Sequence, residues 1–158
     1  MPFTIFDSPL GELTLVADPG GELRGLYFPG TAPALPAADH DPEPLAAATE
    51  QLEQYFRGER TQFDLTLDYK GTPFQRSVWD ALRTIEYGTT TTYGALARAL
   101  EAQPRAVGAA VGATPIPIIV PCHRVIGSDG SLTGYGGGLP RKRALLDLES
   151  GVLPLASV

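Results

Sequence analysis

The apolar pattern of the chain changes at Lys70-Gly71, and this change limits the folds that the chain can adopt. Before it, apolar stretches typical of strands are separated by turn-forming residues at Pro9-Leu10-Gly11 and Asp18–Gly21. After it, apolar residues recur at helical spacing. We therefore predict a mixed α/β (α+β) protein, with an N-terminal sheet subdomain over residues 1–70 and a mostly helical C-terminal domain over residues 71–158.

The N-terminal part is expected to combine three strands with one helix. The two turns divide its start into three stretches, which predicts a three-stranded antiparallel meander. Residues 29–44 are rich in Pro, Ala and Asp and are expected to form a surface loop. A helix is expected to begin at Pro44 and to end before Gly58. Its apolar face would comprise Leu45, Leu52, Tyr55 and Phe56. Residues 63–69 alternate, which predicts a further strand or an extended linker.

The C-terminal part contains three successive helix signals. Thr72-Pro73-Phe74-Gln75 supplies an N-cap, a proline at the first helical position and Gln three residues after the cap, so a helix should follow and end before Gly88. Thr92 can cap a second helix that ends at Leu100, and Pro104 opens a third one with unusually small side chains. Two short helices with a tight break are typical of a helix-turn-helix, although core helices packed through Ala and Gly give the same pattern.

The single cysteine, Cys122, lies beside His123 in the proline-rich segment 115–126. One cysteine excludes an intrachain disulfide, and with two histidines in the chain no zinc site of Cys and His ligands is expected. A cysteine next to a histidine suits an activated nucleophile, because basic groups favour the thiolate. In a strand the two side chains would point to opposite faces, so the pair requires an irregular backbone or a bridging water. The other interpretation is a buried core cysteine.

Charge is divided unevenly between the two parts of the chain. The net charge is −6, but residues 1–70 contain four Lys/Arg and twelve Asp/Glu, whereas residues 71–158 contain eight and six. A locally basic part is compatible with nucleic-acid contact through that part alone. No apolar run is long enough to span a bilayer and the N-terminus lacks a secretory signal, so we expect a cytoplasmic location without membrane attachment.

Five segments resemble, in order and spacing, the O6-alkylguanine-DNA alkyltransferases, also called methylated-DNA–protein-cysteine methyltransferases. They are GTPFQRSVWDAL (71–82), TTYGALA (91–97), RAVGAA (105–110), PCHRV (121–125) and TGYGGG (133–138). The resemblance covers residues 71–149. It implies DNA repair by direct, irreversible and stoichiometric transfer of an alkyl (methyl) group from O6-alkylguanine to a cysteine, after the nucleotide rotates out of the duplex. Whether O4-alkylthymine is also a substrate stays open.

The resemblance assigns the chemistry to four residues. Cys122 would be the alkyl acceptor, and His123 would deprotonate it through a water molecule. Glu149 would orient and polarise His123, and Tyr93 would donate a hydrogen bond to the leaving guanine. No cofactor and no metal are implied. Because a thioether has no easy reverse path, each molecule would act once.

The resemblance also assigns the contacts with DNA. Arg105 would fill the gap that the rotated nucleotide leaves in the duplex. The other implied DNA-binding positions are Thr92, Ala106, Gly108 and Ala109. The base pocket would involve Tyr93, Val111, Pro117, Val125, Tyr135 and Gly136, with the Gly136 amide near the guanine oxygen. The partner would be double-stranded DNA that contains O6-alkylguanine, bound by a monomer.

Thr114 departs from the family pattern, which has Asn before this proline. Thr keeps a hydroxyl but lacks the reach of the amide, which predicts a less firmly held turn and faster transfer in a Thr114→Asn protein. The alternative function is a lesion-binding protein without transfer chemistry. Proteins of that kind lack the acceptor cysteine, whereas this chain has Cys122.

Overall fold

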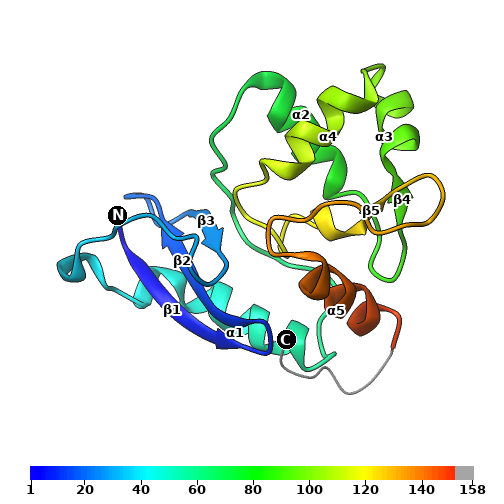
Figure 1. The fold of residues 1–158 in the computed structure, drawn as a ribbon. Coiled ribbons are helices and arrows are strands. Elements are labelled where there is room, and N and C mark those ends of the chain that lie inside the picture. Colours follow the sequence, from blue (N-terminus) through cyan, green and yellow to red (C-terminus); the bar gives the residue numbers. More distant parts are fainter. Residues whose placement is uncertain (152–158) are drawn as a thin grey trace. The chain divides into compact units, whose positions relative to one another are not determined.

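The computed structural model describes residues 1–151, which form two compact units, residues 1–70 and 71–151 (Figure 1). The first unit contains a sheet and one α-helix, and the second contains four α-helices and a short two-stranded sheet. The prediction of a mixed α+β fold is thus confirmed. Within residues 1–151, no helix is both long enough and apolar enough to cross a membrane.

The sheet of the first unit is an antiparallel meander with the strand order β1-β2-β3, as predicted. Its strands are β1 (Phe3–Ser8), β2 (Gly11–Ala17) and β3 (Leu23–Tyr27). The turn between β1 and β2 is closed by Ser8 paired with Gly11, whose φ of 102° favours glycine. Alternate strand residues such as Leu13 and Leu15 are fully buried and form the core of this unit.

Helix α1 (Ala46–Phe56) lies alongside this sheet (Figure 1). Leu52 and Tyr55 on its inner face are fully buried, and each such side chain contributes about 2 kcal/mol by leaving water. Pro44 lies in a 3₁₀ turn, Glu43–Leu45, so the α-helix begins two residues later than predicted. A second 3₁₀ turn, Ala37–Asp39, interrupts the predicted loop.

Residues 63–69 form an extended linker rather than a full strand. Their contact with the sheet is a single bridge between Leu23 and Leu67. Leu23 N–H donates to the Thr66 carbonyl over 3.1 Å, and Asp68 N–H donates to the Leu23 carbonyl over 2.8 Å. Both main-chain groups of Leu23 are therefore used, which ties the linker to the edge strand β3.

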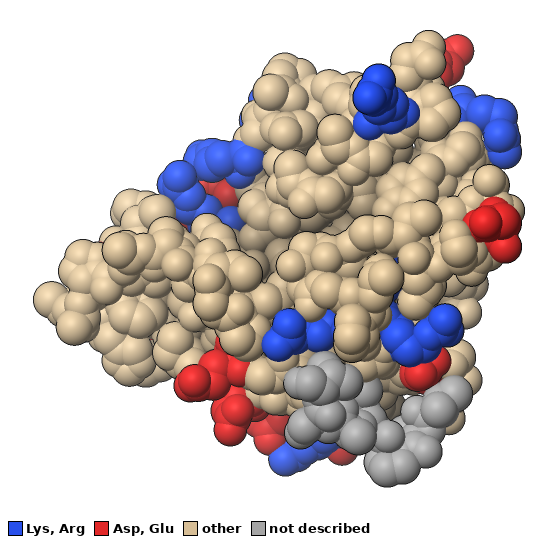
Figure 2. Space-filling model, viewed as in Figure 1, with Lys and Arg blue, Asp and Glu red and all other residues tan. Residues whose placement is uncertain are grey.

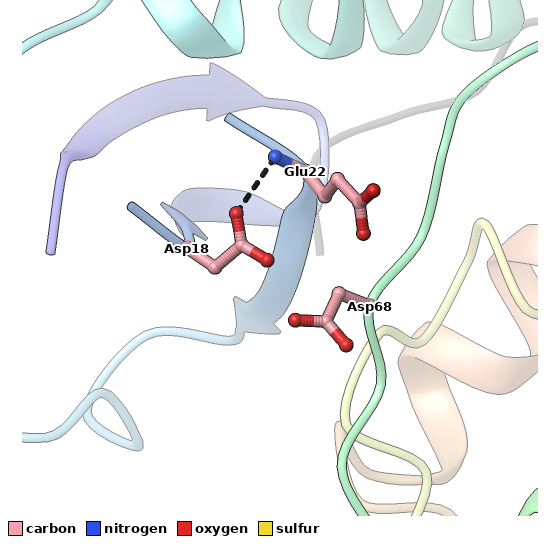
Figure 3. A group of neighbouring side chains, drawn as sticks. All are labelled: Asp18, Glu22 and Asp68. Carbon is pink, nitrogen blue, oxygen red and sulfur yellow. Dashed lines mark hydrogen bonds between the residues drawn. The ribbon is translucent and has the colours of Figure 1, made fainter. Parts of the chain in front are cut away.

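The linker brings Asp68 close to two acidic residues of the β2–β3 turn, Asp18 and Glu22 (Figure 3). The Asp18 carboxylate accepts a hydrogen bond from Glu22 N–H over 3.0 Å and so closes the turn. Asp68 forms an ion pair with Lys70 over 3.1 Å. Hydrogen bonds with Asp18 and with Lys70 lower the pKa of Asp68. These contacts give the carboxylates of Asp18 and Asp68 a structural role.

The second unit contains four α-helices, and the first three are those that the capping signals predict. The four helices are α2 (Pro73–Leu82), α3 (Tyr93–Leu100), α4 (Pro104–Gly112) and α5 (Leu139–Glu149). Strands β4 (Thr91–Thr92) and β5 (Val125–Ile126) pair in parallel. At the start of α2, Thr72 Oγ1 accepts from Gln75 N–H over 3.1 Å and Gln75 Oε1 accepts from Thr72 N–H over 3.0 Å. This is the reciprocal capping box.

Helix α2 ends at Leu82, earlier than the prediction that placed its end just before Gly88. The following residues form tighter turns, in which Ile85 N–H donates to the Leu82 carbonyl over 3.1 Å. The Ile85 carbonyl accepts a hydrogen bond from Arg124 Nη1 over 2.6 Å. This carbonyl therefore binds a distant arginine, whereas in a longer α-helix it would accept a hydrogen bond from a main-chain N–H.

Helices α3 and α4 form the predicted helix-turn-helix arrangement (Figure 1). Thr92 Oγ1 accepts from Ala95 N–H over 3.0 Å and caps α3. Glu101 ends this helix in the left-handed region, with φ of 53°. On the inner side of α4, the Ala110 carbonyl accepts a 2.8 Å hydrogen bond from Trp79 Nε1 of α2. This buried bond holds α4 against the rest of the unit.

Candidate active site

The segment that leads to Cys122 leaves α4 through a turn at Thr114. The turn is closed twice, because Thr114 Oγ1–H and Thr114 N–H donate to the Val111 carbonyl over 2.7 and 3.3 Å. The structure thus shows a hydrogen-bonded turn, and the prediction that Thr holds it less firmly than Asn stays a prediction. Ile118 follows with φ of 74°, a strained value for a buried β-branched residue.

Cys122 and His123 lie in a 3₁₀ turn, Cys122–Arg124, and not in a strand. Cys122 N–H donates to the Val120 carbonyl over 2.7 Å. This is the irregular backbone that the sequence required if both side chains were to serve one site. Both side chains are buried, His123 completely.

His123 is held by Glu149 of α5. Their Nε2 and Oε2 atoms are 2.7 Å apart, and both side chains are buried. Burial lowers the pKa of His123, so the imidazole is neutral at neutral pH despite the carboxylate. Since an ionised Glu149 can only accept, Nε2 carries the proton and Nδ1 is the basic nitrogen. Within residues 1–151, Nδ1 is buried without a hydrogen-bond partner.

Arg124 is a second partner of Glu149, and sequence reasoning missed it. Its Nε donates to Oε1 over 2.7 Å and its Nη2 to Oε2 over 3.0 Å, which is a bidentate pair. Burial raises the pKa of Glu149, but hydrogen bonds from His123 and Arg124 outweigh it and lower this pKa to about 2. Glu149 is therefore ionised at any physiological pH. The position of Arg124 in PCHRV was the available signal.

The thiol of Cys122 is buried, which raises its pKa to about 11. Four groups oppose this effect. The Thr114 hydroxyl, the amides of Cys122 and Ile118 and the positive charge of Lys142 each lower this pKa, but burial outweighs them.

Lys142 is fully buried, which is rare for lysine, and it too was missed. Its Nζ donates to the carbonyls of Val125 and Thr133 over 2.7 and 2.8 Å. It also lies 5.9 Å from the centre of the Tyr93 ring. Lys142 is three residues before the buried Leu145 on α5, and this spacing was a signal that it faces inward.

The other residues that the resemblance assigns to the base pocket occupy three segments. Tyr135 lies in the loop before α5, and its hydroxyl is buried. Burial and the Cys122 thiol raise the pKa of Tyr135 well above its usual value, which keeps the phenol protonated. Gly136 is exposed in the same loop, whereas Val111 and Pro117, which precede Cys122 in the chain, are buried. Val125 pairs with Thr91 in the parallel strands.

The implied DNA-binding residues lie on α3 and α4. Arg105 occupies the first turn of α4 and is exposed, as are Ala106 and Ala109, whereas Gly108 is half-buried. Thr92 is the cap of α3. On the face shown in Figure 2, the basic side chains form separate small groups and not one continuous patch.

Two family matches together cover almost all of the chain. Residues 73–151 match the DNA binding domain of 6-O-methylguanine DNA methyltransferase, and residues 1–69 match the ribonuclease-like domain of the same family. The methylated-DNA–protein-cysteine methyltransferase of Mycobacterium tuberculosis is 50% identical over 160 residues, which are 96% of this chain and 94% of the relative. The enzyme of that name from Methanosarcina acetivorans is 46% identical, over 94% of this chain and 98% of the relative.

Solved structures give the same result. The crystal structure of Mycobacterium tuberculosis OGT in complex with DNA is similar with a TM-score of 0.90 and 50% identity, covering 98% of this chain and 96% of that one. An O6-methylguanine DNA methyltransferase from Methanococcus jannaschii is similar with a TM-score of 0.70 and 28% identity, covering 98% and 96%.

Proposed function

Because the chain belongs to the 6-O-methylguanine DNA methyltransferase family and repairs DNA by methyl transfer to a protein cysteine, we propose that Cys122 is the acceptor. The observation that carries this proposal is the buried set Cys122, His123 and Glu149, in which Glu149 holds His123 over 2.7 Å. The chain has no other cysteine. A lesion-binding protein without transfer chemistry would not need such a set.

We propose that His123 acts as the base through its Nδ1 atom. Glu149 accepts a hydrogen bond from Nε2–H of His123. The lone pair of Nδ1 is therefore available to a water that bridges to the thiol. Arg124 keeps Glu149 ionised and so keeps His123 in this tautomer. Deprotonation is necessary because burial raises the pKa of the thiol to about 11.

The transfer step then balances as one displacement. The Cys122 sulfur attacks the alkyl carbon, a C–S bond forms, and the bond between that carbon and the guanine oxygen breaks with its electron pair moving to the base. Tyr93 donates a hydrogen bond to the leaving guanine, and the nearby Lys142 charge stabilises negative charge that develops on the phenol. Over the whole reaction, the proton of the thiol replaces the alkyl group on guanine.

The product is a thioether, which no group of this site can cleave, so each molecule acts once and needs no cofactor. Arg105 on the exposed side of α4 would enter the duplex in place of the rotated nucleotide. The amide of the exposed Gly136 would contact the guanine oxygen. Residues 71–158 would then be the DNA-binding and acceptor domain. Because the acceptor must stay a free thiol, we also propose a location in the reducing cytoplasm.

Intact-mass spectrometry after incubation with a duplex that contains O6-methylguanine tests the proposal. We expect a gain of one methyl group per protein molecule, on a peptide that contains Cys122. The Cys122→Ser protein should gain none. Methyl transfer by the Cys122→Ser protein, or several repaired lesions per molecule, would contradict the assignment.

A further inference from the structure

The guanidinium of Arg124 has three partners, and two of them belong to the segment that follows α2. Its Nε and Nη2 donate to the two oxygens of Glu149 over 2.7 and 3.0 Å, and its Nη1 donates to the Ile85 carbonyl over 2.6 Å. The ring of Tyr87 is the third partner, with its centre 5.7 Å from Arg124 Cζ, which is a cation–π distance. The Arg124 side chain is only 8% exposed, so little of it meets water.

Tyr87 also contacts α5, the helix that carries Glu149. Its hydroxyl donates to the Leu148 carbonyl over a long 3.5 Å, and Leu148 directly precedes Glu149. Burial and the charge of Glu149 raise the pKa of Tyr87, so the phenol stays neutral at physiological pH. One half-buried side chain thus contacts both the cation and the main chain next to its carboxylate partner.

The bonds from Arg124 fix the rotation of the Glu149 carboxylate. Oε1 accepts from Arg124 Nε, and Oε2 accepts from Arg124 Nη2 and lies 2.7 Å from His123 Nε2. A guanidinium that left this position would free the carboxylate to turn and would weaken its bond with His123. Water would have the same effect, because it competes for the same oxygens. A group that keeps Arg124 in place and dry therefore also maintains the Nε2–H tautomer of His123.

We propose that Tyr87 is a positioning residue for methyl transfer, which acts on His123 through Arg124 and Glu149. This inference rests on the proposed role of His123 as the base. The Tyr87 ring keeps the guanidinium in its bidentate geometry and keeps water away from the ion pair. The role requires an aromatic ring, whereas the hydroxyl contributes little because its bond with Leu148 is long.

The exchange of one imidazole proton with water tests this role. His123 Nε2–H is buried and bonded to a carboxylate, whereas the only other histidine, His40, is exposed. A proton NMR spectrum of the full chain should therefore show a single slowly exchanging imidazole N–H. The indole N–H of Trp79, the only tryptophan, is buried in the same unit and bonded to the Ala110 carbonyl, so its exchange reports on the unit as a whole.

Tyr87→Leu removes the ring, and Tyr87→Phe retains the ring without the hydroxyl. We expect His123 Nε2–H to exchange at least about tenfold faster in Tyr87→Leu, while Trp79 Nε1–H stays within about twofold of its original rate. In Tyr87→Phe both protons should stay within about twofold. Phe74→Leu, which removes an exposed ring from the same unit, is the matched control and should change neither proton. If Tyr87→Leu does not fold, as judged by circular dichroism, Tyr87→Met takes its place.

Single-turnover transfer from free O6-benzylguanine should fall about fivefold in Tyr87→Leu and stay within about twofold in Tyr87→Phe. Unchanged exchange of the His123 proton in Tyr87→Leu would overturn the proposal, as would equal acceleration of both protons, which would indicate a loosened unit. An unchanged transfer rate despite faster exchange would also overturn it, because His123 would then not act as the base. Methylation of a Cys122→Ser protein would overturn only the acceptor assignment, because proton exchange does not depend on transfer.

Discussion

At the scale of single residues, the negative charge of Glu149 serves two interactions. It accepts the Nε2 proton of His123, and it neutralises the buried guanidinium of Arg124. A neutral amide could accept the hydrogen bond from Nε2, but it can also donate one, so it does not fix the tautomer of His123, and it cannot neutralise Arg124. A change that keeps the shape of Glu149 but removes its charge should therefore affect both the reaction and the stability of the fold.

Glu149→Gln should slow methyl transfer by at least about 100-fold, because the amide no longer selects one tautomer of His123. The free energy of unfolding should fall by about 3 kcal/mol, since Arg124 is left buried without its counter-charge. Single-turnover kinetics and urea unfolding measure the two effects. Glu86→Gln, on an exposed residue of the same unit, is the matched control and should behave as the original protein. A rate within twofold of the original would mean that Glu149 does not direct His123.

The buried thiol makes stability depend on alkaline pH. The pKa of Cys122 is about 11 in the folded chain and about 9 when exposed, so the unfolded state loses its proton first as pH rises. Stability from the buried neutral thiol is complete below pH 9 and is lost as pH rises toward 11. The difference in pKa corresponds to about 3 kcal/mol.

Urea unfolding at pH values from 8 to 11 measures this loss against the Cys122→Ser protein, which has no titrating group at the site. The difference in unfolding free energy between the two proteins should shrink with rising pH. Tyr87 and Tyr135 also have raised pKa values, but they occur in both proteins and largely cancel. Parallel curves from pH 8 to 11 would show that Cys122 titrates normally.

At the scale of elements, α4 has separate inner and outer sides. Val107 and Ala110 face the core, and the Ala110 carbonyl is bonded to Trp79. Arg105 and Ala109 are exposed. The small outer side chains allow close approach of another backbone, and Arg105 is the long side chain at the start of this surface.

Arg105→Ala should slow repair of a methylated duplex by at least about tenfold and leave the reaction with free O6-benzylguanine within about twofold, because only the duplex requires a replacement for the rotated base. Single-turnover rates on both substrates measure this. Arg83→Ala, at an exposed arginine after α2, is the matched control. Equal losses on the two substrates would exclude the assigned role of Arg105.

The elements could be predicted where local signals define them, and the site could not be predicted in full. The Thr72 capping box, the Thr92 cap and Pro104 act within a few residues, so the starts of α2, α3 and α4 follow from the sequence. Beyond the end of α2, the Ile85 carbonyl binds Arg124, which lies 39 residues away in the chain. No local pattern carries that information.

The segment 115–126, which contains Cys122, also could not be predicted in full from local patterns. Its prolines exclude an α-helix, but no local pattern in the sequence predicts the 3₁₀ turn at Cys122 or the positive φ of Ile118. The resemblance supplied Glu149 as the partner of His123, and the two are bonded. Arg124 and Lys142 were missed because a charged residue is expected at the surface unless its buried partner is known.

At the scale of the whole molecule, the two units differ in charge. Residues 1–70 carry an excess of acidic groups, and residues 71–158 carry a small excess of basic groups. On the face shown in Figure 2 the basic groups are dispersed. This distribution suits a protein that contacts a few phosphates and avoids strong binding to undamaged DNA.

Affinity for DNA should therefore fall with salt, but less steeply than for strongly basic proteins. Three phosphate contacts would give about a 40-fold loss between 50 and 200 mM salt. Fluorescence anisotropy with a labelled duplex measures the slope, and Cys122→Ser protein prevents transfer during the titration. An affinity that does not change with salt would contradict binding through phosphates.

The order in which the site is completed has a consequence for synthesis of the protein. Glu149 follows His123 by 26 residues, so the ribosome makes Cys122 and His123 well before the carboxylate that binds the imidazole. Residues 1–70 form their own unit and can fold while the second unit is translated, which takes about 4 to 16 s for residues 71–151 at typical rates. A nascent chain that has emerged only as far as Cys122 therefore carries an ordinary cysteine, and reactivity toward alkylated DNA begins only once α5 has been translated and has docked.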